Sequence, residues 1–196
     1  MRILTALVAA AAMAAGAAAA ADKIFGVDVA KPGVRLAEFR YGAHPAGTKV
    51  VCSGDPDQPA GVERTPLTLP KSMDKAKVSR CALFALGKDG LWTPRPVELV
   101  GTPSESWLMA IEDDDRVERV YQVYLRQPHD VFSRTVAAFV ERFGDPAERD
   151  QANARWRTPA FDVMATQDKD SVQVFMVEPR LQALMQARME AKRGRK

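Results

Sequence analysis

The chain contains two cysteines, Cys52 and Cys81, on either side of a segment with little apolar periodicity. Between them lie four prolines and two glycines, which disfavour regular secondary structure (Gly54, Pro56, Pro59, Gly61, Pro66 and Pro70). A disulfide would close a loop of 30 residues, counted from 52 through 81. On the chain-entropy model it would stabilise the fold by about 3–4 kcal/mol. The alternatives are free thiols or a redox pair, although the spacing is unlike C-x-x-C.

The first 21 residues have the three parts of a secretory signal peptide. Arg2 supplies a positive charge, residues 3–21 are apolar, and the closing alanines offer an A-x-A cleavage site. The alternative, a retained membrane helix, is disfavoured because the run is short for ~30 Å of hydrocarbon and is mostly alanine. We therefore expect removal of residues 1–21 and a periplasmic or secreted protein that does not span the membrane. That compartment favours the disulfide.

The remaining chain of about 175 residues is long enough for one domain with its own core. Without Arg2 it carries 27 basic and 25 acidic residues, and residues 188–196 alone have a net charge of +4. The rest of the chain therefore has a net charge near −2. A nucleic-acid-binding protein carries positive charge across one face of its fold, so nucleic acid is not an expected partner.

Residues 22–101 read as short strands between turns. Strands are predicted at 24–29, 49–52 and 81–86, with a hairpin turn at 87–90, a return strand from 91 and an edge strand at 96–100. This part is expected either to extend the sheet of the C-terminal half or to wrap around it.

Residues 104–187 alternate hairpins with helices. The first hairpin is predicted from strands at 107–111 and 117–125, joined by a polar turn; its inward face would carry Val117, Tyr121, Val123 and Leu125. A helix follows at 131–143, with Asp130 as its N-cap and Gly144 and Pro146 as its stop. Strands at 155–157, 161–165 and 172–177 come next, and a last helix begins at Pro179.

These segments predict an α+β fold: an antiparallel sheet with two helices packed on one face and an irregular, disulfide-stapled N-terminal part. We expect one domain over residues 22–187, made of a strand-rich part (22–101) and a hairpin–helix–hairpin–helix part (104–187). A basic C-terminal tail (188–196) follows.

No motif in the chain fixes a catalytic chemistry. The two histidines, His44 and His129, lie in different regions and are interpreted as surface loop residues. The run Asp113–Asp115 is interpreted as a solvated turn, because three consecutive aspartates cannot all face one calcium ion. No catalytic residue, metal ligand or cofactor is predicted.

Two groups of residues are candidates for binding. The tail could contact an envelope protein or anionic lipid through Arg188, Lys192, Arg193, Arg195 and Lys196, or simply be a solvated terminus. Three tryptophans could stack on a ligand or pack in the core: Trp92, Trp107 and Trp156.

The segment Phe139–Pro146, an apolar helix end followed by Gly-x-Pro, and Trp156 ahead of a hairpin carry a local resemblance. Over about 50 of the 196 residues the chain resembles small exported bacterial envelope proteins of unassigned function. The small lipoprotein subunit of the outer-membrane protein assembly machinery shares this layout, which would imply a scaffold role. The chain has no lipid-attachment cysteine after its leader, and the resemblance assigns no functional residue.

Taken together, these features predict a non-enzymatic periplasmic protein that binds an envelope partner through its sheet face or its basic tail. One alternative is a carrier of a small envelope ligand that uses the tryptophans. The other is an unrecognised hydrolase of an envelope polymer, which would need paired carboxylates such as Asp162 and Glu118.

Overall fold

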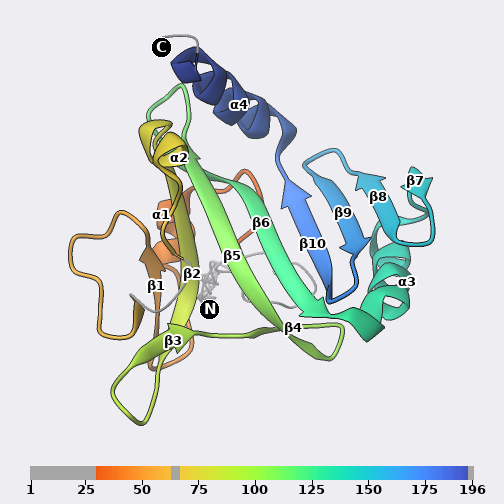
Figure 1. Ribbon diagram of the computed structural model, residues 1–196, viewed down its shortest axis with the longest axis horizontal. Helices are drawn as coiled ribbons and strands as arrows, with labels where there is room; N and C mark the ends of the chain where they lie inside the picture. The colour runs from red at the N-terminus through yellow and green to blue at the C-terminus, as the bar shows by residue number, and fades with distance from the viewer. Residues whose placement is uncertain (1–29, 63–66, 194–196) are drawn as a thin grey trace, which may run out of the picture.

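The computed structural model describes residues 30–62 and 67–193, and within them ten strands form one antiparallel sheet (Figure 1). The order across the sheet is β1-β2-β5-β6-β10-β9-β8-β7, with β3 paired to β2 and β4 to β5. The strands are β1 (Thr48–Cys52), β2 (Val78–Leu86), β3 (Trp92–Pro94), β4 (Val97–Leu99), β5 (Thr102–Glu112), β6 (Glu118–Pro128), β7 (Glu148–Arg149), β8 (Asn153–Arg157), β9 (Asp162–Gln167) and β10 (Ser171–Val177). The N-terminal part therefore extends the sheet of the C-terminal half. The strand expected at 24–29 lies outside the described residues.

The turn between β5 and β6 is organised by Asp113, whose side chain is 4% exposed. Its Oδ1 accepts the backbone N–H groups of Asp115 and Val117, each at 2.9 Å, and its Oδ2 lies 2.6 Å from Nε of Arg119. These hydrogen bonds, led by that from Val117, hold the pKa of Asp113 below its usual value. The polar turn predicted here is confirmed, and Asp114 and Asp115 are exposed as expected. The solvated interpretation is wrong for Asp113, which is buried because its carboxylate accepts the hydrogen bonds that shape the turn.

A β-bulge in β6 sets the direction of Tyr121. Met109 pairs with Gln122 and Ala110 with Val120, so Tyr121 has no register partner on β5. Tyr121 packs with Met109 and is separated from the cluster that holds Val123. The prediction that Tyr121 shares a face with Val123 is therefore wrong, because the extra residue shifts the two-residue alternation by one.

Four helices are described: α1 (Leu36–Arg40), α2 (Lys71–Lys75), α3 (Phe132–Phe143) and α4 (Pro179–Arg193). The helix predicted at 131–143 is confirmed as α3, which ends at Gly144 with a φ of +79°. Asp130 does not cap it, because residues 129–131 form a 3-10 turn that runs directly into α3. Pro179 begins α4 as expected, and Glu178 Oε2 accepts the N–H of Leu181 at 2.6 Å.

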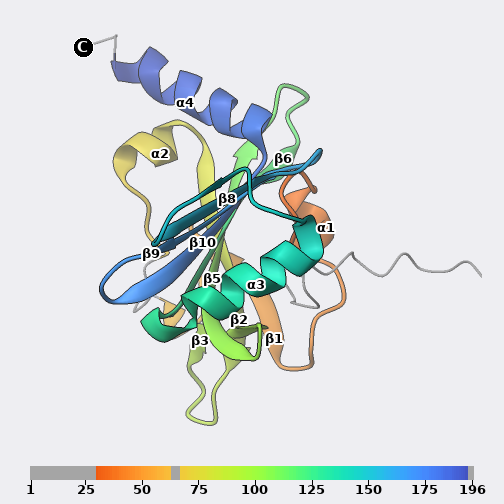
Figure 2. The ribbon, with the colours of Figure 1, turned by 90° about the vertical axis from the view of Figure 1, so that its right-hand side faces the viewer.

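The helices lie on both sides of the sheet, with α1 and α3 opposite α2 and α4 (Figure 2). Phe139 of α3 packs with Val174 in the largest core cluster, whereas Leu181 and Met185 of α4 pack with Met109 in another. Successive strand residues point to opposite faces, so each cluster uses alternate positions. The α+β class and the antiparallel sheet are confirmed. The two predicted helices do not share one face, since an apolar stripe shows that a helix is buried but not against which side.

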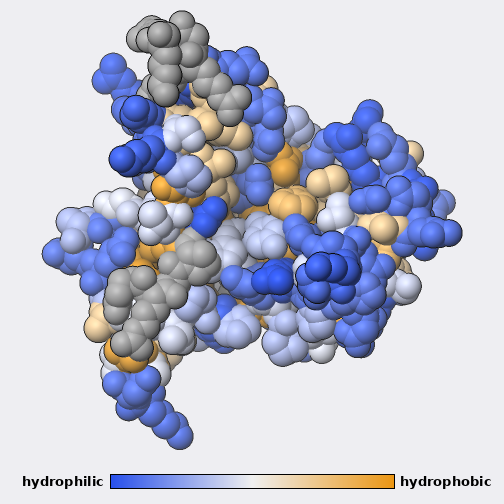
Figure 3. All heavy atoms as spheres, in the orientation of Figure 1, coloured by the Kyte–Doolittle hydropathy of each residue, from blue (hydrophilic) through white to orange (hydrophobic). Residues whose placement is uncertain are grey.

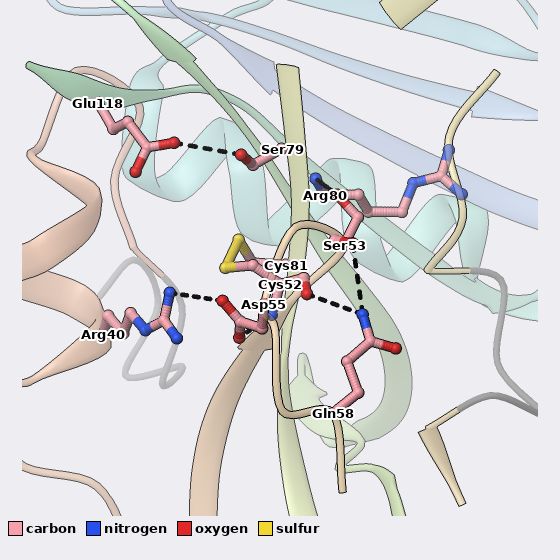
Figure 4. The surroundings of a disulfide bond; sticks show 9 residues. All are labelled: Arg40, Cys52, Ser53, Asp55, Gln58, Ser79, Arg80, Cys81 and Glu118. Carbon is pink, nitrogen blue, oxygen red and sulfur yellow. Dashed lines mark hydrogen bonds and ion pairs between the residues drawn. A yellow bond between two sulfur atoms is a disulfide. The ribbon is translucent and has the colours of Figure 1, made fainter. Parts of the chain in front are cut away.

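Cys52 and Cys81 form a disulfide and are register partners across β1 and β2, as predicted. Asp55 Oδ2 accepts the N–H of Cys52 at 2.9 Å, and Asp55 Oδ1 pairs with Nη1 of Arg40 at 2.8 Å, which ties α1 to this turn (Figure 4). Gln58 Nε2 donates to the carbonyl of Cys52 at 3.2 Å. The loop that carries α2 therefore leaves and returns beside the disulfide.

Candidate binding groove

Two rows of side chains cross β5, β6 and β10 on the face that α2 and α4 occupy. The register aligns a polar row of Glu105, Arg126 and Gln173. Two residues further along each strand it aligns an aromatic row of Trp107, Tyr124 and Phe175. Both rows face the same side because side chains repeat every two residues along a strand.

These rows form the floor of a groove of about 580 Å³. Met73 of α2, Arg80 of β2, and Gln182 and Met185 of α4 complete its lining. Figure 3 shows this face hollowed near its centre, between bulkier regions on either side. The volume lies within the range of about 300–1,000 Å³ that is common for small-molecule sites.

The groove changes character along the strand direction. At one end Met73, Met109 and Met185 surround the buried ring of Tyr121. The aromatic row occupies the middle, where the Tyr124 and Phe175 rings lie 5.2 Å apart. The polar row forms the other end, the charged end, where Glu105 and Arg126 lie. At the methionine-rich end, which we call the apolar end, Arg80 aligns with Met109 and is the charged residue.

The charged end contains an acid–base pair that does not form an ion pair. Glu105 and Arg126 are direct register partners, but Glu105 Oε1 accepts a 2.8 Å hydrogen bond from Nε1 of Trp107. The exposed guanidinium of Arg126 forms no ion pair or hydrogen bond with any described residue. Gln173 is the register partner of Arg126 on β10, and its Nε2 donates a hydrogen bond to Oδ2 of Asp168 at 2.7 Å. Arg126 is thus the available cation of the groove.

Two tyrosines supply neutral hydroxyl groups to the groove. Burial raises the pKa of Tyr121 to about 12, against a smaller opposing effect of Arg80. Burial also raises the pKa of Tyr124, more strongly than nearby Arg126 lowers it. Both phenols therefore remain protonated at neutral pH and can donate hydrogen bonds.

The structure separates the three candidate tryptophans. Trp107 lies in the groove and is 5% exposed. Trp92 packs against the buried cluster that contains Trp107 and Phe84, and Nζ of Lys49 lies 4.5 Å from the centroid of its ring. Trp92 does not line the groove. Trp156 is buried against α3 on the opposite face, where its Nε1 donates to the carbonyl of Gly144 at 2.9 Å. The three do not converge on one ligand site.

Sequence reasoning did not identify Tyr124, Arg126 or Phe175 as site residues. A signal was present, since Gln122, Tyr124 and Arg126 alternate with buried residues on β6, and Gln173 and Phe175 do so on β10. Alternation assigns these residues to a common face. It does not reveal that the two strands are neighbours, which the sheet order supplies.

The basic tail lies at and beyond the end of α4. Arg188 donates through Nη1 to the carbonyl of Glu112 at 2.6 Å, so this guanidinium anchors α4 over the β5–β6 turn. Lys192 and Arg193 fall in the last turn of α4. Arg195 and Lys196 lie outside the described residues.

The carboxylates considered for hydrolysis are not brought together. Asp162 Oδ2 pairs with Nη2 of Arg155 at 2.8 Å on β8, whereas Glu118 accepts a 3.1 Å hydrogen bond from Ser79 Oγ on β2. Glu118 lines a second hollow of about 500 Å³, where Lys77 and Glu112 form an ion pair at 3.3 Å. His44 hydrogen-bonds to the carbonyl of Phe39 at 2.6 Å.

Comparisons with known proteins give no match: no protein-family model, curated protein or solved structure is similar to this chain. Within the described ranges, no helix is both long and apolar enough to cross a membrane. Over the same residues, no group of three or more His, Cys, Asp or Glu side chains is arranged to hold a metal ion.

Proposed function

We propose that this chain is a non-enzymatic binding protein of the bacterial cell envelope, and that its groove is the binding surface. The observation that carries the proposal is the aromatic row, which is formed on a concave sheet face but is incompletely covered by the chain itself. Tyr124 and Phe175 remain half-buried, and Met164, the next residue in register after Phe175, is 39% exposed. A ligand would complete this burial.

The energetics favour an occupant with a substantial apolar part. Covering about 200 Å² of apolar surface contributes roughly 5 kcal/mol at ~25 cal/mol per Å². This gain must exceed the cost of association, which is at least about 4 kcal/mol. Methionine side chains at the apolar end adapt to different shapes, as is typical of surfaces that accept more than one ligand.

The proposed location outside the cytoplasm rests on the predicted leader at residues 1–21 and agrees with the intramolecular disulfide between Cys52 and Cys81. The local resemblance to small exported envelope proteins points the same way.

The test uses N-phenyl-1-naphthylamine, a neutral apolar fluorophore whose emission rises when it leaves water. The protein expressed from the full sequence is titrated with this probe. We expect saturable binding that falls at least fivefold in Phe175→Ser and remains unchanged in Leu86→Ser. Leu86 is a suitable control because it is an exposed apolar residue, at 50%, that does not line the groove.

A second variant tests the groove without a substitution on a strand, so that a misfolded sheet in Phe175→Ser cannot account for the result. Gln182→Trp on α4 would fill the groove from its wall without changing a strand, and should also weaken probe binding. Near-UV circular dichroism reports whether each variant keeps its tertiary packing. A folded wild-type protein that binds no probe, or folded groove variants that bind as tightly as wild type, would refute the proposed function.

A second candidate contact is the tail at residues 188–196, for an anionic lipid surface or an acidic envelope protein. It is favoured by its position, because α4 contributes Met185 to the groove wall and continues into the tail. Sedimentation with phosphatidylglycerol vesicles, with and without residues 188–196, tests the lipid contact. Equal sedimentation of both forms would argue against it.

A further inference from the structure

The two ends of the groove differ in polarity, and among the described residues that line it Arg126 is a cation whose guanidinium forms no ion pair or hydrogen bond. The apolar end is walled by methionines of α2, β5 and α4, and the charged end is formed by the polar row. Only four residue steps separate Met109 from Glu105 on β5, which correspond to ~13 Å at 3.2–3.4 Å per residue. A ligand that matches the groove is therefore elongated, apolar at one end and charged at the other.

We propose that the groove binds a single-chain amphiphile with a carboxylate head, a fatty-acid-like ligand, with its head at Arg126 and its chain directed toward Met109 and Met185. This inference rests on the proposed function and names its ligand class. It depends on Arg126 forming no ion pair, among the described residues, with its register partner Glu105, whose Oε1 accepts the hydrogen bond from Trp107.

The charge of the head follows from the neighbours of Arg126. A guanidinium binds a carboxylate through two parallel hydrogen bonds. Glu105 on β5 and Gln173 on β10 are the two register partners of Arg126. Asp168 is hydrogen-bonded to Gln173, so an acidic group is present on each side of Arg126. Two acids next to one cation favour a ligand with a single negative charge over a doubly charged phosphate monoester.

Arg80, the other arginine of the groove, is not the proposed head site. It aligns with Met109 in the register, at the apolar end, and it already has a partner within the protein. A head placed there would leave the chain against the polar row, where it would cover charged groups and not apolar ones.

The experiment is displacement of bound N-phenyl-1-naphthylamine by three twelve-carbon compounds: dodecanoate, dodecyl phosphate and dodecan-1-ol. We expect dodecanoate to displace the probe at a concentration at least tenfold below that of the other two. Arg126→Gln should remove this preference and Arg126→Lys should retain part of it, with each displacement concentration compared with the affinity of the same variant for the neutral probe. Arg142→Gln, an exposed arginine on the opposite-face helix α3, is the matched control.

The outcomes separate the two proposals. If the neutral probe binds but all three compounds displace it equally, or Arg126→Gln keeps the preference, the carboxylate assignment is wrong and the binding function stands. A preference for dodecyl phosphate overturns the assignment in the same way. If the probe does not bind at all, both proposals fail.

Discussion

Trp107 donates a hydrogen bond from its indole Nε1 to Oε1 of Glu105, two residues earlier on the same strand, at 2.8 Å. The bond directs Glu105 along β5 and away from Arg126, its register partner on β6. Glu105 therefore makes a same-strand hydrogen bond, and among the described residues no ion pair joins it to Arg126.

Trp107→Phe should therefore weaken binding of a carboxylate ligand without removing the aromatic row. Phenylalanine has no N–H, so Glu105 becomes free to pair with Arg126 and to compete with the ligand for it. We expect the ratio of dodecanoate affinity to neutral-probe affinity to fall five- to tenfold, with both affinities measured by fluorescence titration. The double variant Glu105→Gln with Trp107→Phe should restore binding; failure to do so would contradict the competition.

Asp113 should make the stability of the fold depend on acid pH. Its folded pKa is depressed, first by the hydrogen bond from Val117 and then by that from Arg119, so ionised Asp113 stabilises the fold above its unfolded pKa near 3.8. This contribution is lost as pH falls through the lower, folded pKa. Melting temperatures of wild type and Asp113→Asn should differ at pH 6 and converge toward pH 2. A constant difference across that range would count against this role.

Removing the disulfide should lower the free energy of unfolding substantially. The double variant Cys52→Ser with Cys81→Ser frees a 30-residue loop, and the chain-entropy model gives a loss of about 3–4 kcal/mol. Urea unfolding followed by circular dichroism measures it, and wild type unfolded with reductant present serves as the control for the substitutions themselves. Equal midpoints for the variant and the oxidised wild type would exclude a stabilising bridge.

A buried hydrogen-bond chain should make Thr135 sensitive to loss of its hydroxyl. Thr135 Oγ1 donates to Gln127 Oε1 at 2.9 Å, and Gln127 Nε2 donates to the carbonyl of Leu99 at 3.0 Å, which links α3, β6 and β4. Thr135→Val leaves a buried amide oxygen without its donor and should cost about 1–3 kcal/mol in urea unfolding. Thr135→Ser keeps the hydroxyl and should cost less. The reverse order would show that the methyl group, and not the hydrogen bond, matters at this position.

Much of the local structure was predictable, because it is encoded in short segments. The apolar spacing of Phe132, Val136 and Phe139 predicted α3, and Gly144 predicted its end, since few other residues adopt a φ of +79° at low cost. The cysteine pair was also recoverable, because its alternatives were few.

The sequence did not allow us to predict which face of the sheet each helix covers or which residues line the groove. Periodicity within one segment does not specify the neighbour across the sheet, so Tyr124 and Phe175 could not be placed together. The bulge at Tyr121 has no local signature, yet it reverses the direction of a large side chain. Trp92 and Trp156 were predicted as candidates because they are tryptophans. The aromatic row of the groove is instead defined by the order of β5, β6 and β10, which places Tyr124 and Phe175 beside Trp107.

The placing of the helices on opposite sides of the sheet has a consequence for how this protein can change over generations. On β10, Val174 and Met176 serve the α3 side, while Gln173 and Phe175 face the groove. Alternate residues of β10 make their side-chain contacts on opposite faces of the sheet, so a substitution at Gln173 or Phe175 changes contacts on the groove side. Replacing groove residues can therefore alter which ligand is bound while the opposite core keeps the sheet intact, so that one scaffold can acquire new specificities by single steps.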